Sequence, residues 1–586
     1  MIRSRLAVLP LALVAALAAC QPSTPTASAD AQAPATPANA PVEEYVGTTE
    51  PMASDAVYFV VTDRFVNGDP SNDQRDQGGS DPALRTFDRP TPGARAEGDN
   101  IGYLGGDFKG IVDHLDYIRE MGFSAVWITP IVDNPDEAFT GGKRAQKGGF
   151  LTDGGKTGYH GYWGVNFYKL DEHLPSPGLD FAGFTSALHA RDVKVVLDIV
   201  ANHGTPSYSA PTDRPAYGKV FDAAGNKIAD HQNLRPEQLD PSGTPMHAFF
   251  NTKPGLAELS DFNENNPAVM DYLVGAYAQW VGQGADALRI DTIPWLPHSF
   301  WSEFTRRVRE KKPGMFMFGE AFDFDPNKIA EHTLPANAGV SVLDFPLKEG
   351  LAKVFGREGA GFEELAGRLY LDAGPYANPY ELMTFYDNHD MPRLDADDAG
   401  FIDAHNWLFT ARGIPVITYG SEMAFMRGAA EHAGNRNYFG AERIAQARTH
   451  PIRTALARIA KVRQASPALQ RGLQLNVLMQ GQRAAFYRVY QRGDERQIAL
   501  VLLNKGSAPA SFDVREHLQA GRWTAAIGGG AADVPAGGAL TATVPAHGVE
   551  VYLLDAPVTD PSLKAALEPL RNRRVAAVPY APPKPQ

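Results

Sequence analysis

The chain is poor in cysteine and in positive charge. Its only cysteine among 586 residues is Cys20, which excludes an intramolecular disulfide framework and a cysteine-based zinc site. The 55 Lys and Arg residues stand against 68 Asp and Glu residues, which gives a formal net charge of −13. Nucleic-acid binding requires a basic face, so we expect no nucleic-acid partner. After the first twenty residues, no stretch is apolar for long enough to span a bilayer.

Apolar residues, in contrast, are plentiful enough for a large core. Hydrophobic residues make up 44% of the chain and charged residues 21%, which is ordinary for a soluble globular protein. This composition excludes disorder of the whole chain, a collagen-like repeat and a coiled coil.

The first twenty residues have the pattern of an export signal. Arg3 and Arg5 precede the apolar stretch 6–17, which is short for a membrane span. The sequence Leu-Ala-Ala-Cys at residues 17–20 resembles the lipobox of bacterial lipoproteins, and this resemblance implies lipidation of Cys20. The alternative is an ordinary signal peptide, in which Cys20 is incidental.

Residues 21–54 predict a flexible tether, because they begin with a long stretch rich in Ala, Pro, Ser and Thr and lack apolar periodicity. With a lipidated Cys20 followed by Gln21, we expect an exported bacterial lipoprotein. It would be periplasmic or at the cell surface, held at the outer membrane by its N-terminal lipid.

Between residues 57 and 419, short apolar runs alternate with runs of helical spacing. Strands are predicted at 57–61, 125–128, 193–199, 285–290, 315–318, 340–345, 382–386 and 415–419. Helices are predicted between them, among others at 108–121, 181–191, 269–283 and 300–310. Eight βα units of this length predict an α/β fold, a (β/α)8 TIM barrel over residues 55–468. A doubly wound open sheet is the alternative.

Two further regions differ from the barrel in composition and in the pattern of apolar residues. Residues 203–265 are rich in Pro, Gly, Asp and His and predict a loop-rich B domain inserted after the third strand. Residues 469–556 contain strand-like runs and Gly-rich turns, which predict a C-terminal antiparallel β-sandwich domain. Residues 557–586 are expected to form a tail.

Polar residues follow several of the predicted strands. Asp198 and His203 lie in and after the third, Arg289 and Asp291 at the end of the fourth, Glu320 after the fifth, and His389 and Asp390 after the seventh. The C-terminal strand ends of a barrel carry its active site, so these side chains are expected to converge there.

These blocks resemble the signature regions of the α-amylase superfamily of glycoside hydrolases, of the family 13 type. The matching blocks are 198–203, 284–291, 318–320 and 385–390, with weaker matches at 259–263 and 413–422. The similarity extends over residues 56–556, and the barrel is most like those of α-amylases and cyclodextrin glucanotransferases. The resemblance implies a retaining mechanism with Asp291 as nucleophile, Glu320 as general acid/base and Asp390 as a further catalytic carboxylate.

The chemistry of retention explains these residue types. A retaining glycosidase needs an ionised nucleophile and a protonated carboxylic acid about 5 Å apart. Arg289 lies two residues before Asp291 on the same predicted strand, so both face the same side, and its charge is expected to keep Asp291 ionised. Glu320 must be protonated when substrate arrives, and the nearby Phe318 and Phe322 are compatible with a less polar site.

The resemblance also implies residues that bind the substrate, an α-glucan. These are Arg289, His160, Tyr162, His203, His389 and Arg436. An aromatic ring such as that of Tyr162 suits the apolar face of a sugar. The segment 292–295 stands where many amylases carry a Lys-His pair, and we expect its Trp295 to stack on the leaving-group sugar instead.

A structural Ca²⁺ is the expected cofactor. The residues that resemble the calcium loop of cyclodextrin glucanotransferases are Asn67, Asp69, Asn72, Asp73, Gly105 and Asp107. Calcium prefers six to eight oxygen ligands of these types, although Asp, Asn and Gly also form ordinary turns. A second family site would use Asn202 and Asp261 with a histidine after the nucleophile, and the first one available is His298.

The most specific expectation is an α-amylase that cleaves α-1,4-glucosidic bonds of starch or maltooligosaccharides. Ala257 occupies the position of the central aromatic residue of cyclodextrin-forming transferases, and the chain has no room for their additional C-terminal domains; both features favour hydrolysis. The alternatives are a cyclomaltodextrinase- or neopullulanase-like hydrolase and an α-glucan transglycosylase. An inactive glucan-binding surface lipoprotein is disfavoured, because all three carboxylates are present.

Overall fold

The computed structural model describes most of the chain from residue 43 onward. The described ranges are 43–93, 99–146, 152–210, 217–430 and 434–582. The expected signal peptide with Cys20, and the tether up to residue 42, lie outside these ranges. Within them, no helix is both long and apolar enough to cross a membrane.

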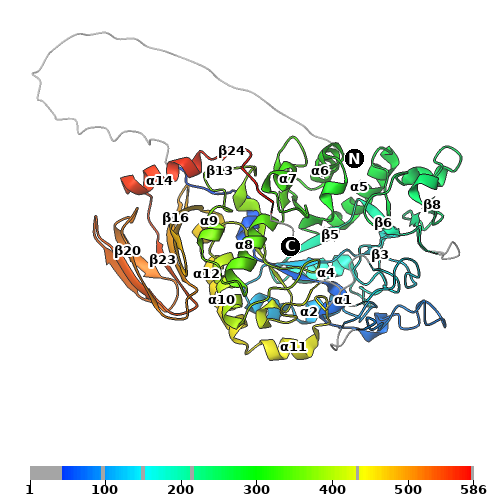
Figure 1. The fold of residues 1–586 in the computed structure, drawn as a ribbon, viewed down its shortest axis with the longest axis horizontal. Helices are drawn as coiled ribbons and strands as arrows, with labels where there is room; N and C mark the ends of the chain where they lie inside the picture. Colours follow the sequence, from blue (N-terminus) through cyan, green and yellow to red (C-terminus); the bar gives the residue numbers. More distant parts are fainter. Residues whose placement is uncertain (1–42, 94–98, 147–151, 211–216, 431–433, 583–586) are drawn as a thin grey trace, which may run out of the picture. The chain divides into compact units, whose positions relative to one another are not determined.

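Eight parallel strands form the predicted barrel (Figure 1). They are β1 (Val57–Val60), β2 (Ala125–Ile128), β5 (Lys194–Ile199), β10 (Ala287–Ile290), β11 (Phe316–Gly319), β12 (Ser341–Val342), β14 (Met383–Thr384) and β15 (Ile414–Thr418). Their order in the sheet is β12-β11-β10-β5-β2-β1-β15-β14. A parallel bridge between Leu343 and Met383 joins the two edges, so the sheet is closed and the prediction of a barrel is confirmed.

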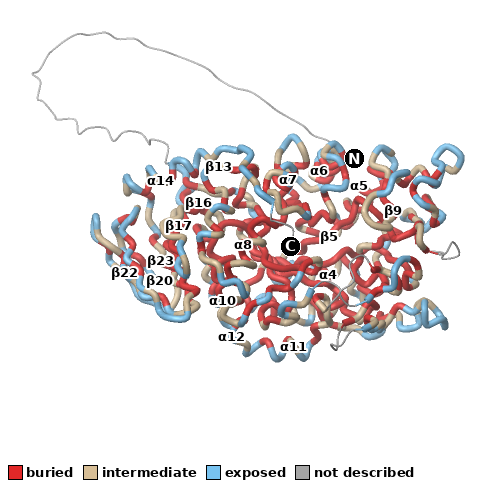
Figure 2. The backbone as a smooth tube through the Cα atoms, in the orientation of Figure 1, coloured by how far each residue is buried: buried red, intermediate tan, exposed pale blue. Residues whose placement is uncertain are grey.

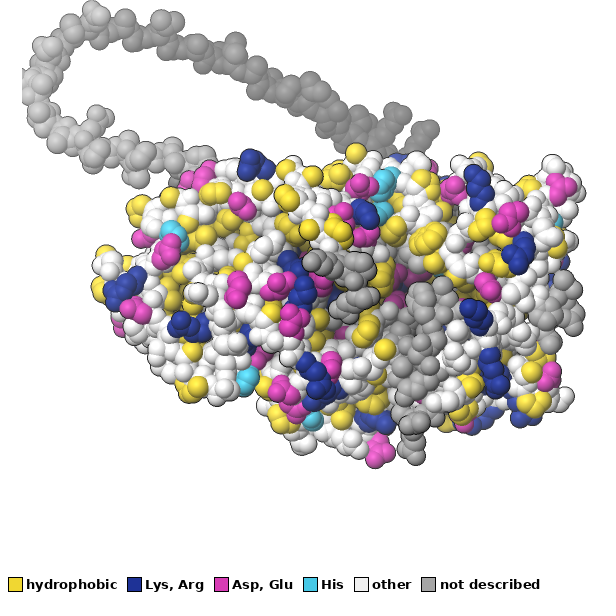
Figure 3. All heavy atoms as spheres, viewed as in Figure 1, with side chains coloured by type: hydrophobic (Ala, Val, Ile, Leu, Met, Phe, Trp, Pro, Cys, Tyr) yellow, Lys and Arg dark blue, Asp and Glu magenta, His cyan; other side chains and the backbone are white. Residues whose placement is uncertain are grey.

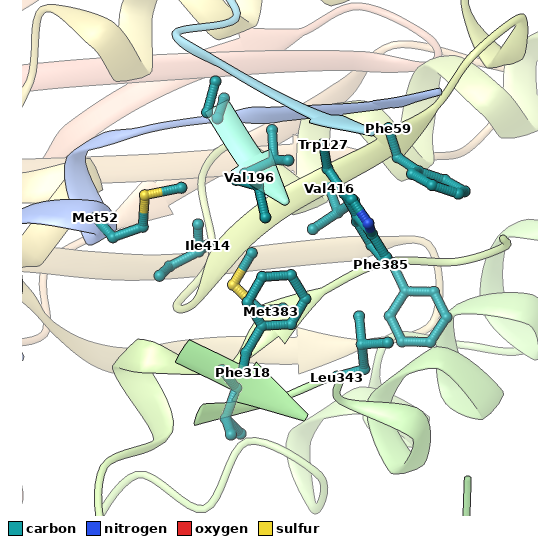
Figure 4. Packing of buried hydrophobic residues seen from close by; sticks show 14 of the residues in the cluster. Met52, Phe59, Trp127, Val196, Phe318, Leu343, Met383, Phe385, Ile414 and Val416 are labelled. Atoms are coloured by element: carbon teal, nitrogen blue, oxygen red, sulfur yellow. The ribbon is translucent and has the colours of Figure 1, made fainter. Parts of the chain in front are cut away.

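The barrel interior is filled by large apolar side chains. Every residue of β1, β2, β10 and β11 is buried, and Figure 2 shows buried backbone around the barrel strand β5. The Trp127 ring lies 4.2 Å from that of Phe59 and 5.4 Å from that of Phe318, measured between centroids. Figure 4 shows these residues in the packed interior. A filled interior leaves chemistry to the strand ends.

Fourteen α-helices occur in the described part of the chain. They are α1 (Thr62–Phe65), α2 (Phe108–Asp113), α3 (Leu115–Glu120), α4 (Phe181–His189), α5 (Pro267–Gly282), α6 (His298–Lys311), α7 (Pro326–Ala330), α8 (Phe345–Phe355), α9 (Glu363–Ala366), α10 (Asp398–Leu408), α11 (Gly440–Ala447), α12 (Pro451–Gln464), α13 (Pro467–Arg471) and α14 (Pro561–Arg571). The helix predicted at 108–121 is two helices, because the backbone of His114 is not helical.

The loops after the second and third barrel strands carry small antiparallel pairs. After β2, the antiparallel pair of β3 (Val132–Asp133) and β4 (Asn166–Leu170) was not predicted. After β5 come β6 (His203–Pro206), β7 (Lys219–Phe221), β8 (Lys227–Asp230) and β9 (Leu259–Asp261). Strand β6 pairs with β9, and β7 pairs with β8. The inserted region therefore folds back on the C-terminal end of β5.

The C-terminal domain is built from two antiparallel sheets. One has the order β16-β17-β18-β23-β20-β21 and the other consists of β19 and β22. The strands are β16 (Leu473–Gln480), β17 (Arg483–Arg492), β18 (Glu495–Asn504), β19 (Ala510–Val514), β20 (Gly521–Ala525), β21 (Ala531–Val534), β22 (Leu540–Val544) and β23 (Gly548–Leu554). The face drawn in Figure 3 carries interspersed basic and acidic side chains.

The expected tail at 557–586 differs from the structure. Helix α14 begins at an Asp560 cap and buries Leu563, Leu567 and Leu570. These leucines have the spacing of one helix face, which explains why the segment is helical and not a tail. Strand β24 (Arg574–Val575) then pairs with β13 (Ala373–Gly374) in the barrel domain. Part of the expected tether is also packed, because Tyr45 is 1% exposed and pairs with Gln491 in β17.

Candidate active site

Arg289 in β10 is the centre of a cluster of carboxylates. Its side chain is fully buried. Its Nη1 lies 2.9 Å from Asp198 Oδ1 and 2.7 Å from Asp291 Oδ1, and its Nη2 lies 2.9 Å from Glu320 Oε2. One guanidinium therefore pairs with three carboxylates, which offsets the cost of burying its charge.

The parallel register of the strands brings these side chains together. Arg289 pairs with Asp198 of β5 on one side and with Phe318 of β11 on the other. The ladder continues past the strand ends: the Asp291 N–H donates to the Ile199 carbonyl at 2.9 Å, and the Glu320 N–H donates to the Ile290 carbonyl at 2.8 Å. Asp291 and Glu320 therefore stand on neighbouring positions of the barrel rim.

Asp390 belongs to a second polar cluster on the same rim. Its Oδ2 lies 3.2 Å from His389 Nε2, and its Oδ1 accepts a hydrogen bond from Arg436 Nη2 at 2.7 Å. Arg436 Nε also donates to the His389 carbonyl at 2.8 Å. Arg436 therefore fixes both the backbone and the carboxylate of this loop.

Tyr162 connects the two clusters. Its hydroxyl donates to Asp198 Oδ2 at 2.9 Å and lies 2.8 Å from His389 Nε2. Its ring stacks on that of His389, with centroids 5.5 Å apart and planes inclined by 9°. Trp127 Nε1 donates to the same Asp198 oxygen at 3.0 Å. Asp198 thus accepts hydrogen bonds on both oxygens and anchors Arg289 rather than facing substrate.

The carboxyl groups of Glu320 and Asp390 differ in their pKa. Burial raises the pKa of Glu320 well above its ordinary value, Asp291 and Asp390 raise it further, and Arg289 opposes them. Burial also acts on Asp390, but His389 and the guanidinium groups of Arg436 and Arg289 lower its pKa to about 2. At neutral pH this arrangement favours a protonated Glu320 beside an ionised Asp390.

The histidines of the site are held neutral by burial. Burial lowers the pKa of His389 to about 3 and that of His160 well below its ordinary value, and it also lowers the pKa of His203. A neutral imidazole has one N–H donor and one acceptor nitrogen. Such side chains can donate a hydrogen bond to a sugar hydroxyl without adding charge.

A cleft of about 470 Å³ opens over these groups. Its lining includes most of the expected site residues: His160, Tyr162, His203, Asp291, Trp295, Glu320, Asp390 and Arg436. Arg289 and His389 lie beneath the cleft as buried supports. The volume and the mixture of apolar and polar lining are typical of a small-molecule site.

Phe322 is a lining residue whose orientation the sequence did not reveal. Trp295 is 51% exposed and Phe322 is 52% exposed, and both line the cleft together with Glu320. They are the only large aromatic side chains among the described residues with that degree of exposure. Phe322 follows Glu320 by two residues, and this proximity is the signal that could have identified it.

The expected calcium residues converge around Gly105. Asn67 Nδ2 donates to Asp73 Oδ1 at 2.6 Å, and a Cβ placed on Gly105 would lie 2.3 Å from both of these atoms. Asn67 Oδ1 and Asn72 Oδ1 are buried with no hydrogen-bond partner. Two unpartnered buried oxygens beside a carboxylate fit the preferences of Ca²⁺.

Two of the expected calcium residues have other partners. Asp107 accepts from the backbone N–H groups of Gly68, Asp69 and Gly110, at 3.0, 2.8 and 2.6 Å, and so caps α2. Asp69 Oδ1 accepts from the Ser71 N–H at 3.0 Å. The Asp73 oxygens accept from Asn67 Nδ2 and from Arg75 Nη2, so the oxygens of this set that are buried without a partner are Asn67 Oδ1 and Asn72 Oδ1. In the described ranges, no group of three or more His, Cys, Asp or Glu side chains is placed to hold a metal.

The residues expected at a second calcium position do not converge with His298. Asn202 Nδ2 donates directly to Asp261 Oδ1 at 3.2 Å. His298 lies 3.3 Å from Glu331 Oε2, and its ring packs against His332. His298 is therefore engaged elsewhere.

Comparison with known proteins agrees with this geometry. The model of the α-amylase catalytic domain matches residues 59–457. A cyclomaltodextrin glucanotransferase of Niallia circulans is 29% identical over 558 residues, covering 90% of this chain and 71% of that protein. An α-amylase of the same organism is 28% identical, covering 80% of this chain and 84% of its own length. The chain spans 63–71% of the length of the curated glucanotransferases it matches.

Solved structures of α-amylases and glucanotransferases are also similar to this chain. An Anoxybacillus α-amylase has a TM-score of 0.65 and 26% identity, covering 87% of this chain and 99% of its own. The cyclomaltodextrin glucanotransferase CldA, described as having a three-domain ABC distribution, has a TM-score of 0.68 and 27% identity, covering 86% and 99%. Because the family model spans more than half of it, this chain belongs to the α-amylase family and carries the family's catalytic domain at residues 59–457.

Proposed function

We propose that the protein is an α-amylase, which cleaves α-1,4-glucosidic bonds of starch or maltooligosaccharides with retention of configuration. The observation that carries this proposal is the shared ion pairing of Asp291 and Glu320 with Arg289, on the floor of one cleft. A retaining glycosidase needs such a pair of neighbouring carboxyl groups in different protonation states.

In the proposed reaction, Asp291 attacks the anomeric carbon while Glu320 donates its proton to the glycosidic oxygen. The bond to the leaving sugar breaks and a glycosyl ester forms on Asp291. Glu320, now ionised, then takes a proton from water, whose oxygen attacks the anomeric carbon and releases Asp291. Arg289 contacts both carboxyl groups and supplies a fixed positive charge beside them.

The groups around Asp390 are proposed to bind the sugar that is cleaved. In the neutral form of His389 with its proton on Nε2, this N–H lies between Tyr162 and Asp390. Asp390 accepts hydrogen bonds from sugar hydroxyls, while His160 and His203 donate to others. Arg436 holds Asp390 and lies toward the non-reducing side. Ionised Asp390 also favours the positive charge that develops on the sugar in the transition state.

Trp295 and Phe322 are proposed to bind the leaving-group sugar. Both lie close to Glu320 in the chain fold: the Thr292 N–H, three residues before Trp295, donates to Glu320 Oε2 at 3.3 Å, and Phe322 follows Glu320. A general acid stands beside the departing oxygen, so the leaving sugar lies on its side of the cleft. Exposed rings offer that sugar two apolar surfaces.

We propose a structural Ca²⁺ at the loop of residues 67–73. Asn67, Asn72 and Asp73 would hold the ion with side-chain oxygens, and the Gly105 carbonyl is a candidate backbone ligand. The ion would supply positive charge that fixes this loop against the segment at 105–107.

The protein is further proposed to be an exported lipoprotein, anchored through lipid on Cys20 at the outer membrane. The N-terminal sequence pattern is the support for this proposal.

A transglycosylase is the second candidate, favoured by the exposed aromatic pair beside Glu320. A sugar bound there can replace water as the acceptor. The number of C-terminal domains does not separate hydrolases from glucanotransferases, because CldA is a glucanotransferase described with three domains. Ala257 remains as the argument for hydrolysis.

A product profile tests the proposal. Soluble starch, maltoheptaose, β-cyclodextrin, pullulan and trehalose are incubated with the purified protein, and the products are separated by chromatography. Short linear maltooligosaccharides from starch support the α-amylase. Products longer than the maltoheptaose supplied identify transfer, and preferential cleavage of β-cyclodextrin or pullulan identifies the cyclomaltodextrinase-like alternative.

A further inference from the structure

The C-terminal segment 573–582, called the strap here, connects the C-terminal domain to the barrel. Arg573 donates to the carbonyls of Tyr370 and Tyr376 at 2.8 and 2.7 Å. The Ala576 N–H donates to the Gly374 carbonyl at 2.9 Å, next to the pairing of β24 with β13. Figure 1 shows these two strands side by side. The strap is therefore fixed to the barrel domain by backbone hydrogen bonds.

Beyond β24, the strap meets α7 through a reciprocal pair of hydrogen bonds. The Val578 N–H donates to Asn327 Oδ1 at 2.8 Å, and Asn327 Nδ2 donates to the Val578 carbonyl at 3.0 Å. The side-chain amide of Asn327 thus makes the same two hydrogen bonds to Val578 that the backbone of a neighbouring β-strand would make. The two residues are 251 positions apart in the chain.

A series of short contacts leads from Asn327 back to the catalytic loop. Both the backbone N–H and the Nδ2 of Asn327 donate to Asp325 Oδ1 at 2.9 Å. The Asp325 N–H donates to Asp323 Oδ1 at 2.8 Å, and Lys328 Nζ donates to Asp323 Oδ2 at 2.9 Å. The turn between Glu320 and α7 is therefore held by the residues that the strap contacts.

Phe322 depends on this turn for its position. Its ring lies 4.9 Å from that of Phe345 and 6.2 Å from that of Phe324, and half of its surface is exposed to the cleft. Because few side chains pack against Phe322, the position of its ring depends on the conformation of the backbone at 321–325.

We propose that the strap is a positioning element for the leaving-group side of the cleft. Val578, acting through Asn327 and Asp325, fixes the loop at 321–325 so that Phe322 contacts the leaving-group sugar. This inference rests on the proposed function and adds a determinant of substrate preference that lies outside the catalytic domain match at 59–457.

The test uses full-length variants and two substrates. Asn327→Ala removes the side-chain pair, and Val578→Pro removes the donor N–H in a segment that already contains Pro579 and Pro582. Asn337→Ala is the matched control, because the Asn337 side chain donates to the nearby Glu331 carbonyl and not to the strap. Maltoheptaose has a leaving-group sugar, whereas α-maltosyl fluoride releases only fluoride.

Both strap variants are expected to lower kcat/KM for maltoheptaose about tenfold while changing that for α-maltosyl fluoride less than about twofold. Phe322→Ala should give the same selective loss, and the double variant Asn327→Ala/Phe322→Ala should lose no more than either single variant. Equal losses on both substrates, no loss with either strap variant, or additive losses in the double variant would overturn the inference. A wild-type protein that cleaves neither substrate would refute the proposed function itself.

Discussion

The Tyr162 hydroxyl lies 2.8 Å from His389 Nε2, and this contact joins the two halves of the site. On one side, Tyr162 donates to Asp198, which holds Arg289 and through it Asp291 and Glu320. On the other side, His389 leads to Asp390. The Tyr162 hydroxyl therefore bridges the two clusters.

Replacing Tyr162 by Phe tests this connection. The variant keeps the ring but removes a hydrogen bond to a buried carboxylate, which is worth about 1.5–3 kcal/mol. We expect kcat/KM to fall about 10- to 100-fold, with a lower Tm in thermal unfolding. The control is Tyr208→Phe, whose hydroxyl donates to the Ala257 carbonyl away from the carboxylates. Unchanged kinetics in Tyr162→Phe would show that the link is dispensable.

The raised pKa of Glu320 predicts the pH profile. A group with a raised pKa keeps its proton through neutral pH and loses it as the pH rises through that pKa, so kcat/KM should fall on the alkaline side. Asp390, with a pKa of about 2, stays ionised far into the acid range.

Glu320→Gln should lower kcat on maltoheptaose about 10²- to 10⁴-fold and abolish the alkaline limb. Asp390→Asn removes a negative charge that raises the pKa of Glu320, so the alkaline limb of its residual activity should move to lower pH. An unmoved limb in Asp390→Asn, or a retained limb in Glu320→Gln, would assign the titration to another group.

Trp295 should matter only when a leaving-group sugar is present. Trp295→Ala is expected to lower kcat/KM for maltoheptaose about tenfold and that for α-maltosyl fluoride less than about twofold, because only the former contacts the ring. Met246→Ala serves as control, since Met246 is 37% exposed and does not line the cleft. Parallel losses on both substrates would argue for a structural role of Trp295.

Calcium should stabilise the fold by mass action. Ca²⁺ at a concentration 100 times its Kd would add about 2.7 kcal/mol to the free energy of unfolding. Chelation should therefore lower the Tm of the wild type, and Asn67→Ala should start lower and respond less. Asn265→Ala, at an exposed asparagine, should behave as the wild type. If neither the chelator nor added calcium changed the Tm of the wild type, the proposed calcium site would be refuted.

Most barrel strands could be predicted from the sequence, because they are short apolar runs that alternate with longer runs of helical spacing. Even β12 and β14, with two residues each, lie within the predicted runs. The sequence does not predict the pairing of β3 with β4, since Val132–Asp133 is too short to show a period. It predicts a tail in place of helix α14 because the chain there ends in a proline-rich run, although Leu563, Leu567 and Leu570 have helical spacing.

The sequence predicted those site residues whose type alone indicates catalysis. It did not predict those whose role depends on where the side chain points. Strand-end carboxylates such as Asp291 and Glu320 have few other reasons to occur together. A phenylalanine, in contrast, is equally suited to the core and to a binding surface, so the exposure of Phe322 needed the structure. The engagement of Asp107 as a helix cap likewise depends on backbone geometry that the sequence does not display.

The anomeric form of the first product tests the central claim most directly. Maltoheptaose is cleaved in an NMR tube, and the anomeric protons are followed before mutarotation equilibrates them, with Asp291→Asn as the inactive control, expected to lose at least about 10³-fold in kcat. Double displacement through Asp291 predicts that the new reducing ends appear first as the α-anomer. Initial release of the β-anomer, or undiminished turnover by Asp291→Asn, would contradict the account.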